Sequence, residues 1–214
     1  MGGFFGAIAK RDIKYDVFFG VDYHSHLGTR RAGMIIHDEK DGFQRQIHSI
    51  DNTPFRTKFE KDLVKFNGNM GIGCISDADP QPLMVRSHMG VYAISCIGVI
   101  NNADALVDEY CEKTGHQFMA MSSGKVNTTE LTAALINCCD NLVDGIHYAQ
   151  AAIEGSCTIL LLTPDGLIAA RDKLGRLPIV VGKSEFGRCC AMESFACQKL
   201  GYQPDYNQIG RAHV

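Results

Sequence analysis

The sequence predicts a single α+β domain, and the order of its segments is the main reason. Apolar stretches typical of strands dominate the first half, helical segments follow, and short apolar strands return after about residue 154. No internal repeat and no linker-like stretch interrupts this order. A length of 214 residues suits one large domain with a substantial core.

In the first half, the glycine-punctuated apolar start predicts a buried strand. Residues 15–27 have apolar side chains at mixed spacing, and we expect Gly28 to end this segment as a C′ glycine. Residues 55–66 have apolar side chains at helical spacing, with Lys and Glu between them. The predicted strands of this half cover residues 2–8, 31–37, 44–50, 71–76, 83–85 and 91–97.

The second half begins with capping signals for helices. Asn102 is expected to cap a helix over residues 103–113, with its side chain accepting a bond from the first-turn amides. Asn127 or Thr128 is expected to open a second helix, or a pair of helices, that runs to about residue 154.

Short apolar runs then predict strands up to a last helix. Asp165 and Gly166 form a hairpin turn signal between the first two of these strands. Ser194 is expected to cap a short helix that reaches Leu200. The predicted strands cover residues 157–162, 167–171, 179–182 and 189–192.

The composition excludes several classes of function. A net charge of −3 and a pI near 6.2 give no electrostatic case for binding nucleic acid or an anionic membrane. No apolar run approaches the roughly 20 residues that span a bilayer. The start lacks the basic region and long apolar region of a secretory signal, so we expect a cytoplasmic protein.

Nine cysteines are many for such a chain, but their pattern is not that of a metal site. The number is odd, and neither a CxxC motif nor a Cys/His zinc spacing occurs. Several lie inside apolar runs, which indicates buried, reduced thiols that act as small hydrophobic side chains. A metal site or a redox pair remains the alternative. We expect no metal and no cofactor.

The first eight residues read Met-Gly-Gly-Phe-Phe-Gly-Ala-Ile. They resemble the Met-Cys-Gly-apolar-apolar-Gly-apolar opening of class II glutamine amidotransferases at every position but one. In that family the cysteine, exposed as the N-terminus, is the nucleophile, and its own α-amine assists as the base. Here the cysteine position is Gly2, which would become the first residue after removal of the initiator Met.

The resemblance extends over roughly residues 2–205 and points to the amidophosphoribosyltransferase branch. Residues 102–106, Asn-Ala-Asp-Ala-Leu, resemble the family's Asn-Ala-Glu-Glu-Leu helix start. Residues 161–178 are very similar to the matching amidophosphoribosyltransferase segment, and residues 191–194 continue the match. The resemblance implies the N-terminal-nucleophile hydrolase fold, a four-layer αββα arrangement with two stacked antiparallel sheets between helix layers.

The resemblance also places the family's glutamine site, and five of its positions differ here. Besides the nucleophile, the family has an arginine that supports the site, an arginine that holds the substrate carboxylate, a His-Asn-Gly oxyanion element and an aspartate that binds the substrate ammonium. The corresponding positions, which we interpret as a degenerate glutamine pocket, are Gly2, Leu27, Ser76, Ile97 with Gly98, and Thr128. Glutamine is a zwitterion, and these residues offer its charges no partner.

The sequence therefore favours a pseudo-glutaminase domain retained as a scaffold or regulatory domain. An engineered trap would alter one position, whereas here five differ together and the scaffold motifs survive. Two alternatives stay open. One is an active enzyme with a relocated nucleophile, for which Cys96 or Cys74 would be the candidates, with His24 or His26 as the base. The other is a module that binds something less polar than glutamine.

The resemblance implies further parts of the protein. Family members continue with a phosphoribosyltransferase domain and act in purine biosynthesis, and we expect a homo-oligomer. We expect the amidotransferase-like domain to cover residues 1–208. Residues 209–214 match a reading frame of a common sequencing adapter, so we expect a non-native tail at a truncation, with the transferase domain missing downstream. No phosphoribosyltransferase motif occurs in the 214 residues of the sequence.

Overall fold

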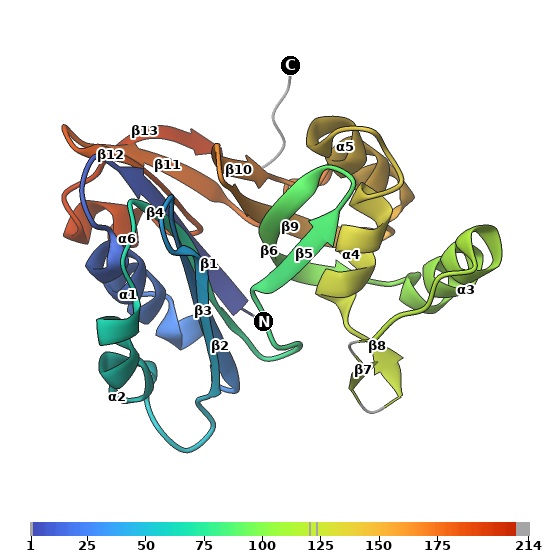
Figure 1. Cartoon of the computed structure of the whole chain (residues 1–214), viewed down its shortest axis with the longest axis horizontal. Coiled ribbons are helices and arrows are strands. Elements are labelled where there is room, and N and C mark those ends of the chain that lie inside the picture. The colour runs from blue at the N-terminus through green and yellow to red at the C-terminus, as the bar shows by residue number, and fades with distance from the viewer. Residues whose placement is uncertain (1, 120, 123, 209–214) are drawn as a thin grey trace.

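Four layers make up the structure, a computed structural model that describes residues 2–119, 121–122 and 124–208. Two antiparallel sheets lie face to face, and helices cover the outer face of each (Figure 1). This arrangement confirms the expected α+β class with two stacked antiparallel sheets between helix layers. The expected tail at residues 209–214 lies outside the described residues.

The larger sheet has seven strands in the order β13-β11-β12-β1-β4-β2-β3. Strand β1 lies near its middle, and both faces of β1 are buried. Phe5 contacts the helix side, whereas Phe4 packs between the two sheets. The strands are β1 (Gly2–Ala9), β2 (Arg31–Asp38), β3 (Gly42–Ser49), β4 (Met70–Ser76), β11 (Ile179–Lys183), β12 (Gly187–Ala191) and β13 (Gln203–Gln208).

The smaller sheet has four strands in the order β10-β9-β6-β5. Its inner face supplies Ala93, Ile97 and Leu160 to the core between the sheets. A separate two-stranded hairpin, β7 (Met121–Ser122) and β8 (Lys125–Val126), lies in the chain between the helices Ala103–Thr114 and Thr128–Ile136. The strands of the smaller sheet are β5 (Leu83–Ser87), β6 (Gly90–Ile100), β9 (Gly155–Thr163) and β10 (Gly166–Ala170).

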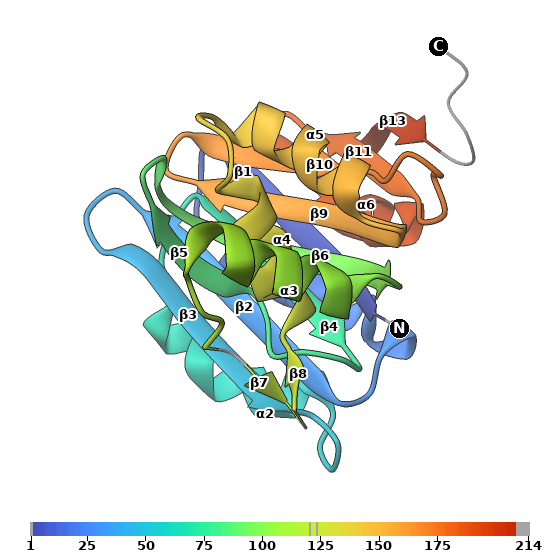
Figure 2. The ribbon, with the colours of Figure 1, turned by 90° about the vertical axis from the view of Figure 1, so that its right-hand side faces the viewer.

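Each helix layer buries one apolar core against its sheet. Helices α1 (Lys14–Asp22), α2 (Phe55–Phe59) and α6 (Ser194–Lys199) cover the larger sheet. Helices α3 (Ala103–Thr114), α4 (Thr128–Ile136) and α5 (Leu142–Ala152) lie on the side of the smaller sheet, as Figure 2 shows. Among the described residues, no helix is both long and apolar enough to cross a membrane.

Several local predictions are wrong in instructive ways. Gly28 has φ −166° and ψ 154°, so it is extended and does not end a helix as a C′ glycine. A β-carbon there would lie 2.7 Å from Ile75 Cγ2, which explains the glycine by close packing. Helix α1 already ends at Asp22, and a 3₁₀ turn, η1 (Ser25–Leu27), follows.

The predicted helix caps differ too. Asn102 makes no capping bond; its side chain instead donates to the carbonyl of Ala152 and accepts from the amide of Glu154, which ties α3 to the α5–β9 junction. Ser194 is the first residue of α6, and Glu193 occupies the N-cap position. In contrast, Asn127 caps α4 as expected, accepting from two first-turn amides.

The segment 55–66 is less regular than its spacing indicates. The α-helix ends at Phe59, and a 3₁₀ segment, η2 (Glu60–Lys65), continues it. The apolar positions at 55, 59, 63 and 66 are nevertheless all buried. The periodicity therefore identified the buried face correctly although the backbone tightens after one turn.

Candidate functional site

A cavity of about 310 Å³ lies at the start of β1, between the two sheets. Each of the six positions that the sequence assigned to a degenerate pocket lines it: Gly2, Leu27, Ser76, Ile97, Gly98 and Thr128. They come from β1, η1, β4, β6 and the start of α4. The fold thus brings together residues that are far apart in the sequence.

The surroundings of Gly2, the position that the resemblance assigns to the nucleophile, leave no room for a side chain. It pairs with Ser76 across the β1–β4 ladder. A β-carbon on Gly2 would lie 2.5 Å from the carbonyl oxygen of Ile75 and 2.9 Å from Ile97 Cδ1. Real β-carbons essentially never approach other atoms this closely. The side chain of Ile97 and the backbone of β4 therefore fill the space that a catalytic side chain would need.

The positions expected to hold the two charged ends of glutamine carry neutral hydroxyl groups. Ser76 Oγ accepts a hydrogen bond from the amide of Ala78 at 3.1 Å. The amide and the hydroxyl of Thr128 both donate to Asp79 Oδ2, each at 2.8 Å. These groups are thus bonded within the protein and supply no charge to the cavity.

Among the described residues that line the cavity, one has a charged side chain, and it is an acid. Glu193 lies at the rim, where its Oε1 is 3.1 Å from Nε2 of the exposed His26. Among the described lining residues there is no Lys or Arg. An α-carboxylate entering this cavity would meet the carboxylate of Glu193 and no cationic side chain of these residues. Across the described part of the chain, no group of three or more His, Cys, Asp or Glu could hold a metal ion.

Gly98 and Gln81 show how tightly the wall of the cavity is built. A β-carbon on Gly98 would lie 2.0 Å from the carbonyl oxygen of Ser156, so only glycine permits this approach of β6 and β9. The buried Gln81 side chain accepts from the amide of Cys96 at 2.8 Å and donates to its carbonyl at 3.0 Å. The Gln81 side chain therefore satisfies both backbone groups of Cys96 on β6, as the backbone of a neighbouring strand would.

The two cysteines considered as relocated nucleophiles are both buried. Cys74 is fully buried, and burial raises the pKa of its thiol to about 12. Cys96 does line the cavity, but it is only 9% exposed, and burial raises the pKa of its thiol well above the ordinary value. Because the thiolate is the nucleophilic form, these environments oppose activation.

Neither candidate base compensates for this. His24 is completely buried, and Nδ1 contacts the carbonyl oxygen of Gly20 at 2.6 Å. Burial lowers the pKa of this imidazole from its ordinary value. Neither His24 nor His26 lines the cavity. The geometry thus does not favour the relocated-nucleophile alternative.

The segment after β10 forms one side of the cavity. Arg171 donates from Nε to the carbonyl of Leu177 at 2.8 Å, and a second donor of its guanidinium reaches the carbonyl of Gly175. These bonds hold the loop whose Leu177 and Pro178 line the cavity. The sequence prediction treated this retained segment as scaffold; the structure adds that it also shapes the candidate site.

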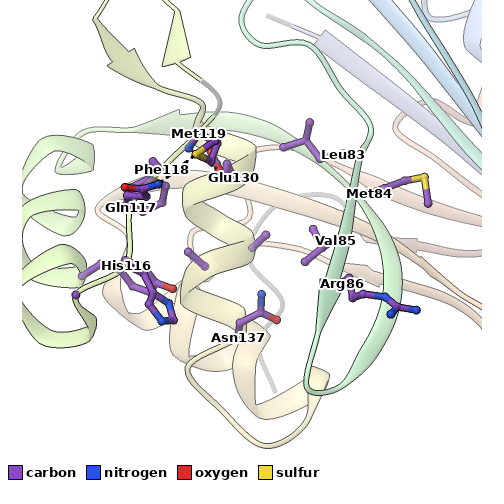
Figure 3. Close-up of a pocket in the computed structure, with 14 residues that line it drawn as sticks. Leu83, Met84, Val85, Arg86, His116, Gln117, Phe118, Met119, Glu130 and Asn137 are labelled. Carbon is purple, nitrogen blue, oxygen red and sulfur yellow. Dashed lines mark hydrogen bonds between the residues drawn. The ribbon is translucent and has the colours of Figure 1, made fainter.

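A second depression of about 810 Å³ lies beside β5, away from these residues. Figure 3 shows its labelled side chains coming from β5, from α4 and from the segment after α3. None of the positions that the resemblance assigns to glutamine lies there. The smaller cavity at Gly2 is therefore the candidate functional site.

Sequence reasoning missed part of this site. Gln81 and Ser156 line the cavity, yet nothing in their local pattern marks them as site residues. Met192, Glu193 and the pair Leu177-Pro178 also line it, and they had a usable signal because they belong to motifs shared with the resembled family. The sequence favours a scaffold role for the segment that ends at Pro178, with an interface to a following domain as the alternative.

The comparisons with known proteins agree with the fold and with the resemblance. The chain is 27% identical over 212 residues to the amidophosphoribosyltransferase of Methanocaldococcus jannaschii, covering 94% of this chain and 44% of the relative. It is 26% identical to the amidophosphoribosyltransferase of Archaeoglobus fulgidus, covering 92% of this chain and 42% of the relative. This chain thus spans a little under half the length of either relative.

A solved structure shows the same fold. The glutamine phosphoribosylpyrophosphate amidotransferase of B. subtilis superposes with a TM-score of 0.84 at 24% identity, over 97% of this chain and 45% of that one. The family model described as "Glutamine amidotransferase domain" matches residues 69–196, which is more than half of the chain. The chain therefore belongs to the glutamine amidotransferase domain family.

Proposed function

We propose that this domain has lost glutamine hydrolysis and serves as a scaffold or regulatory domain of an amidophosphoribosyltransferase-like protein. The observation that carries the proposal is the crowding at Gly2, where a β-carbon would lie 2.5 Å from the backbone oxygen of Ile75. A glycine offers no nucleophile, and its surroundings leave no space for one.

The rest of the cavity supports the same conclusion. Binding a zwitterion in a partly dry site requires a partner for each charge, because an unpaired buried charge is very costly. Glu193 is the one charged side chain among the described lining residues, and the hydroxyls of Ser76 and Thr128 are bonded within the protein. Substrate binding would therefore fail even if a nucleophile were supplied.

The proposal extends to the protein around the domain. The relatives named amidophosphoribosyltransferase are more than twice as long as the matched region. We place the domain at residues 1–208, followed by a phosphoribosyltransferase domain, in a cytoplasmic homo-oligomer of purine biosynthesis. In this setting the domain would contribute contacts to its neighbour rather than ammonia.

Covalent labelling tests the loss of the glutamine site. The protein is incubated with a diazoketone analogue of L-glutamine, which alkylates a nucleophile that the glutamine site presents, and adducts are mapped by mass spectrometry. We expect no adduct that excess L-glutamine suppresses. A glutamine-protected adduct on Cys96 or Cys74, absent from the Cys96→Ser or Cys74→Ser variant, would instead establish a relocated nucleophile. Iodoacetamide treatment of the unfolded chain confirms that each thiol can be alkylated.

A further inference from the structure

We propose that the cavity at Gly2 binds a compact, uncharged and largely apolar molecule. This inference rests on the proposed function, because it concerns the same cavity after its glutamine chemistry has been lost. The cavity is still open without this glutamine chemistry, with a volume of about 310 Å³. Small-molecule sites in proteins have about this volume or more, and apolar side chains form most of their walls.

The walls of this cavity are apolar on several sides. Leu27, Ile97, Val99, Leu177 and Met192 line it, and they come from different segments of the chain. Val99 is 64% exposed, which places an apolar side chain at the entrance. Water in such a space has few polar partners, so a ligand with an apolar body displaces it favourably.

The polar groups of the lining are already engaged. Ser76 accepts from the amide of Ala78, Ser156 Oγ accepts from the amide of Val99 at 3.3 Å, and Gln81 is bonded to β6. Within the part of the chain that the structure describes, none of the buried side-chain N or O atoms without a hydrogen-bond partner belongs to a lining residue. The lining groups therefore do not need a polar ligand to complete their hydrogen bonding, although these hydroxyls can each form one further hydrogen bond.

Charge narrows the ligand class further. The carboxylate of Glu193 repels an anion, and the described lining residues include no Lys or Arg side chain to offset it. At about 30 Å³ for each water-sized unit, the space suits a body on the order of ten non-hydrogen atoms. A neutral ring compound with a single hydroxyl group satisfies these limits, whereas an amino acid does not.

The test compares three probes by NMR on uniformly ¹⁵N-labelled protein: p-cresol, 4-hydroxybenzoate and L-glutamine. The first two share a phenol ring and differ in whether a methyl group or a carboxylate stands opposite the hydroxyl. We expect p-cresol to cause saturable shifts of the Ser76 and Gly98 amides, with a Kd of about 1 mM or tighter. We expect no such shifts from 4-hydroxybenzoate or glutamine at the same concentrations.

Matched variants locate the binding. Leu177→Trp places a larger side chain in the cavity wall and should weaken p-cresol binding by about tenfold or more. Leu83→Trp, at a partly buried leucine in the depression beside β5, should leave it unchanged. Because Leu177→Trp could disturb folding, Glu193→Gln provides a second test. It removes the repelling charge, so 4-hydroxybenzoate should now cause saturable shifts of the Ser76 and Gly98 amides that it does not cause in the unaltered protein.

The outcomes separate this inference from the proposed function. Absence of saturable p-cresol shifts at Ser76 and Gly98, equal binding of 4-hydroxybenzoate by the unaltered protein, or no response to Glu193→Gln would each overturn the inference. In those cases the loss of glutamine chemistry would still stand. Saturable shifts of the same amides by glutamine would overturn the inference and would show that the cavity still binds glutamine, whereas the proposed loss of hydrolysis is overturned by a glutamine-protected adduct in the labelling experiment.

Discussion

Ile97 Cδ1 lies 2.9 Å from the point where a β-carbon on Gly2 would stand. The two residues lie in different sheets, and both line the cavity. The resemblance assigns these two positions to a nucleophile and an oxyanion element. An isoleucine methyl group thus lies where a side chain at position 2 would begin, so a glycine at position 2 and an isoleucine at position 97 fit together sterically.

Gly2→Ala is expected to destabilise the protein by about 1–3 kcal/mol, the usual cost of overpacking a filled site. The reason is that the new β-carbon would meet the backbone oxygen of Ile75, which cannot turn aside as a side chain does. Urea denaturation measures the free energy of unfolding.

Gly6→Ala, on the same strand, is the control for this experiment. A β-carbon on Gly6 would lie 3.1 Å from the side chain of Leu160 and 3.2 Å from that of Ile72, so the free energy of unfolding should decrease less than in Gly2→Ala. Equal decreases for the two variants would show that Gly2 is no more crowded than Gly6.

Most of the fold could be predicted from the sequence because strand alternation and hairpin signals are local. The parts that were missed depend on distant partners. Strand β13 lies at the edge of the larger sheet and pairs with β11, yet its sequence, Gln-Pro-Asp-Tyr-Asn-Gln, lacks an apolar pattern. Asn102 has the residue type of a helix cap, but its side chain is used by the backbone near Glu154.

The candidate site also has some features that could be predicted from the sequence and others that could not. Motif positions carried over from the resembled family located six lining residues, because order and spacing along the chain are preserved. The crowding at Gly2 depends on how β1, β4 and β6 meet, which no local pattern records. Gln81 is a similar case, because its role lies in its hydrogen bonds to Cys96 on β6.

His24 predicts a specific dependence of stability on pH. Burial lowers the pKa of its folded imidazole below the ordinary value of 6.5. Between that lowered pKa and 6.5, the unfolded chain binds a proton that the folded chain does not, so the free energy of unfolding falls as the pH decreases. Denaturation at intervals from pH 7 to pH 5 should therefore show a smaller slope for His24→Gln than for the unaltered protein. Identical slopes would contradict the assignment of a buried, neutral His24.

Tyr202→Phe should cost about 1–3 kcal/mol, because it removes a buried hydrogen bond to a charged group. The hydroxyl of Tyr202 donates to Asp16 Oδ2 at 2.9 Å, and the two residues are 1% and 6% exposed. Tyr15→Phe, at a residue that is 56% exposed, should change the free energy of unfolding by less than about 0.5 kcal/mol. Equal effects of the two substitutions in urea denaturation would refute the contribution of the buried pair.

Arg171→Ala should destabilise the protein by about 2–3 kcal/mol, because the carbonyls of Leu177 and Gly175 lose a charged donor. Arg188→Ala removes an exposed ion pair with Asp205 and should cost no more than about 1 kcal/mol. Amide shifts of residues 172–178 provide a second readout. If those shifts and the free energy of unfolding both stayed unchanged in Arg171→Ala, the arginine would not hold the cavity loop.

Ammonia release from L-glutamine decides whether this domain has lost glutamine hydrolysis. The assay compares the unaltered protein with Gly2→Cys, after mass spectrometry has established the N-terminal residue of each and circular dichroism has shown that each is folded. We expect no release above the protein-free rate from either protein. The restored thiol would be crowded by Ile75 and Ile97, and the substrate's charges would still lack partners. Turnover by the unaltered protein would contradict the loss of hydrolysis, and turnover by Gly2→Cys alone would show that the cavity still accepts glutamine.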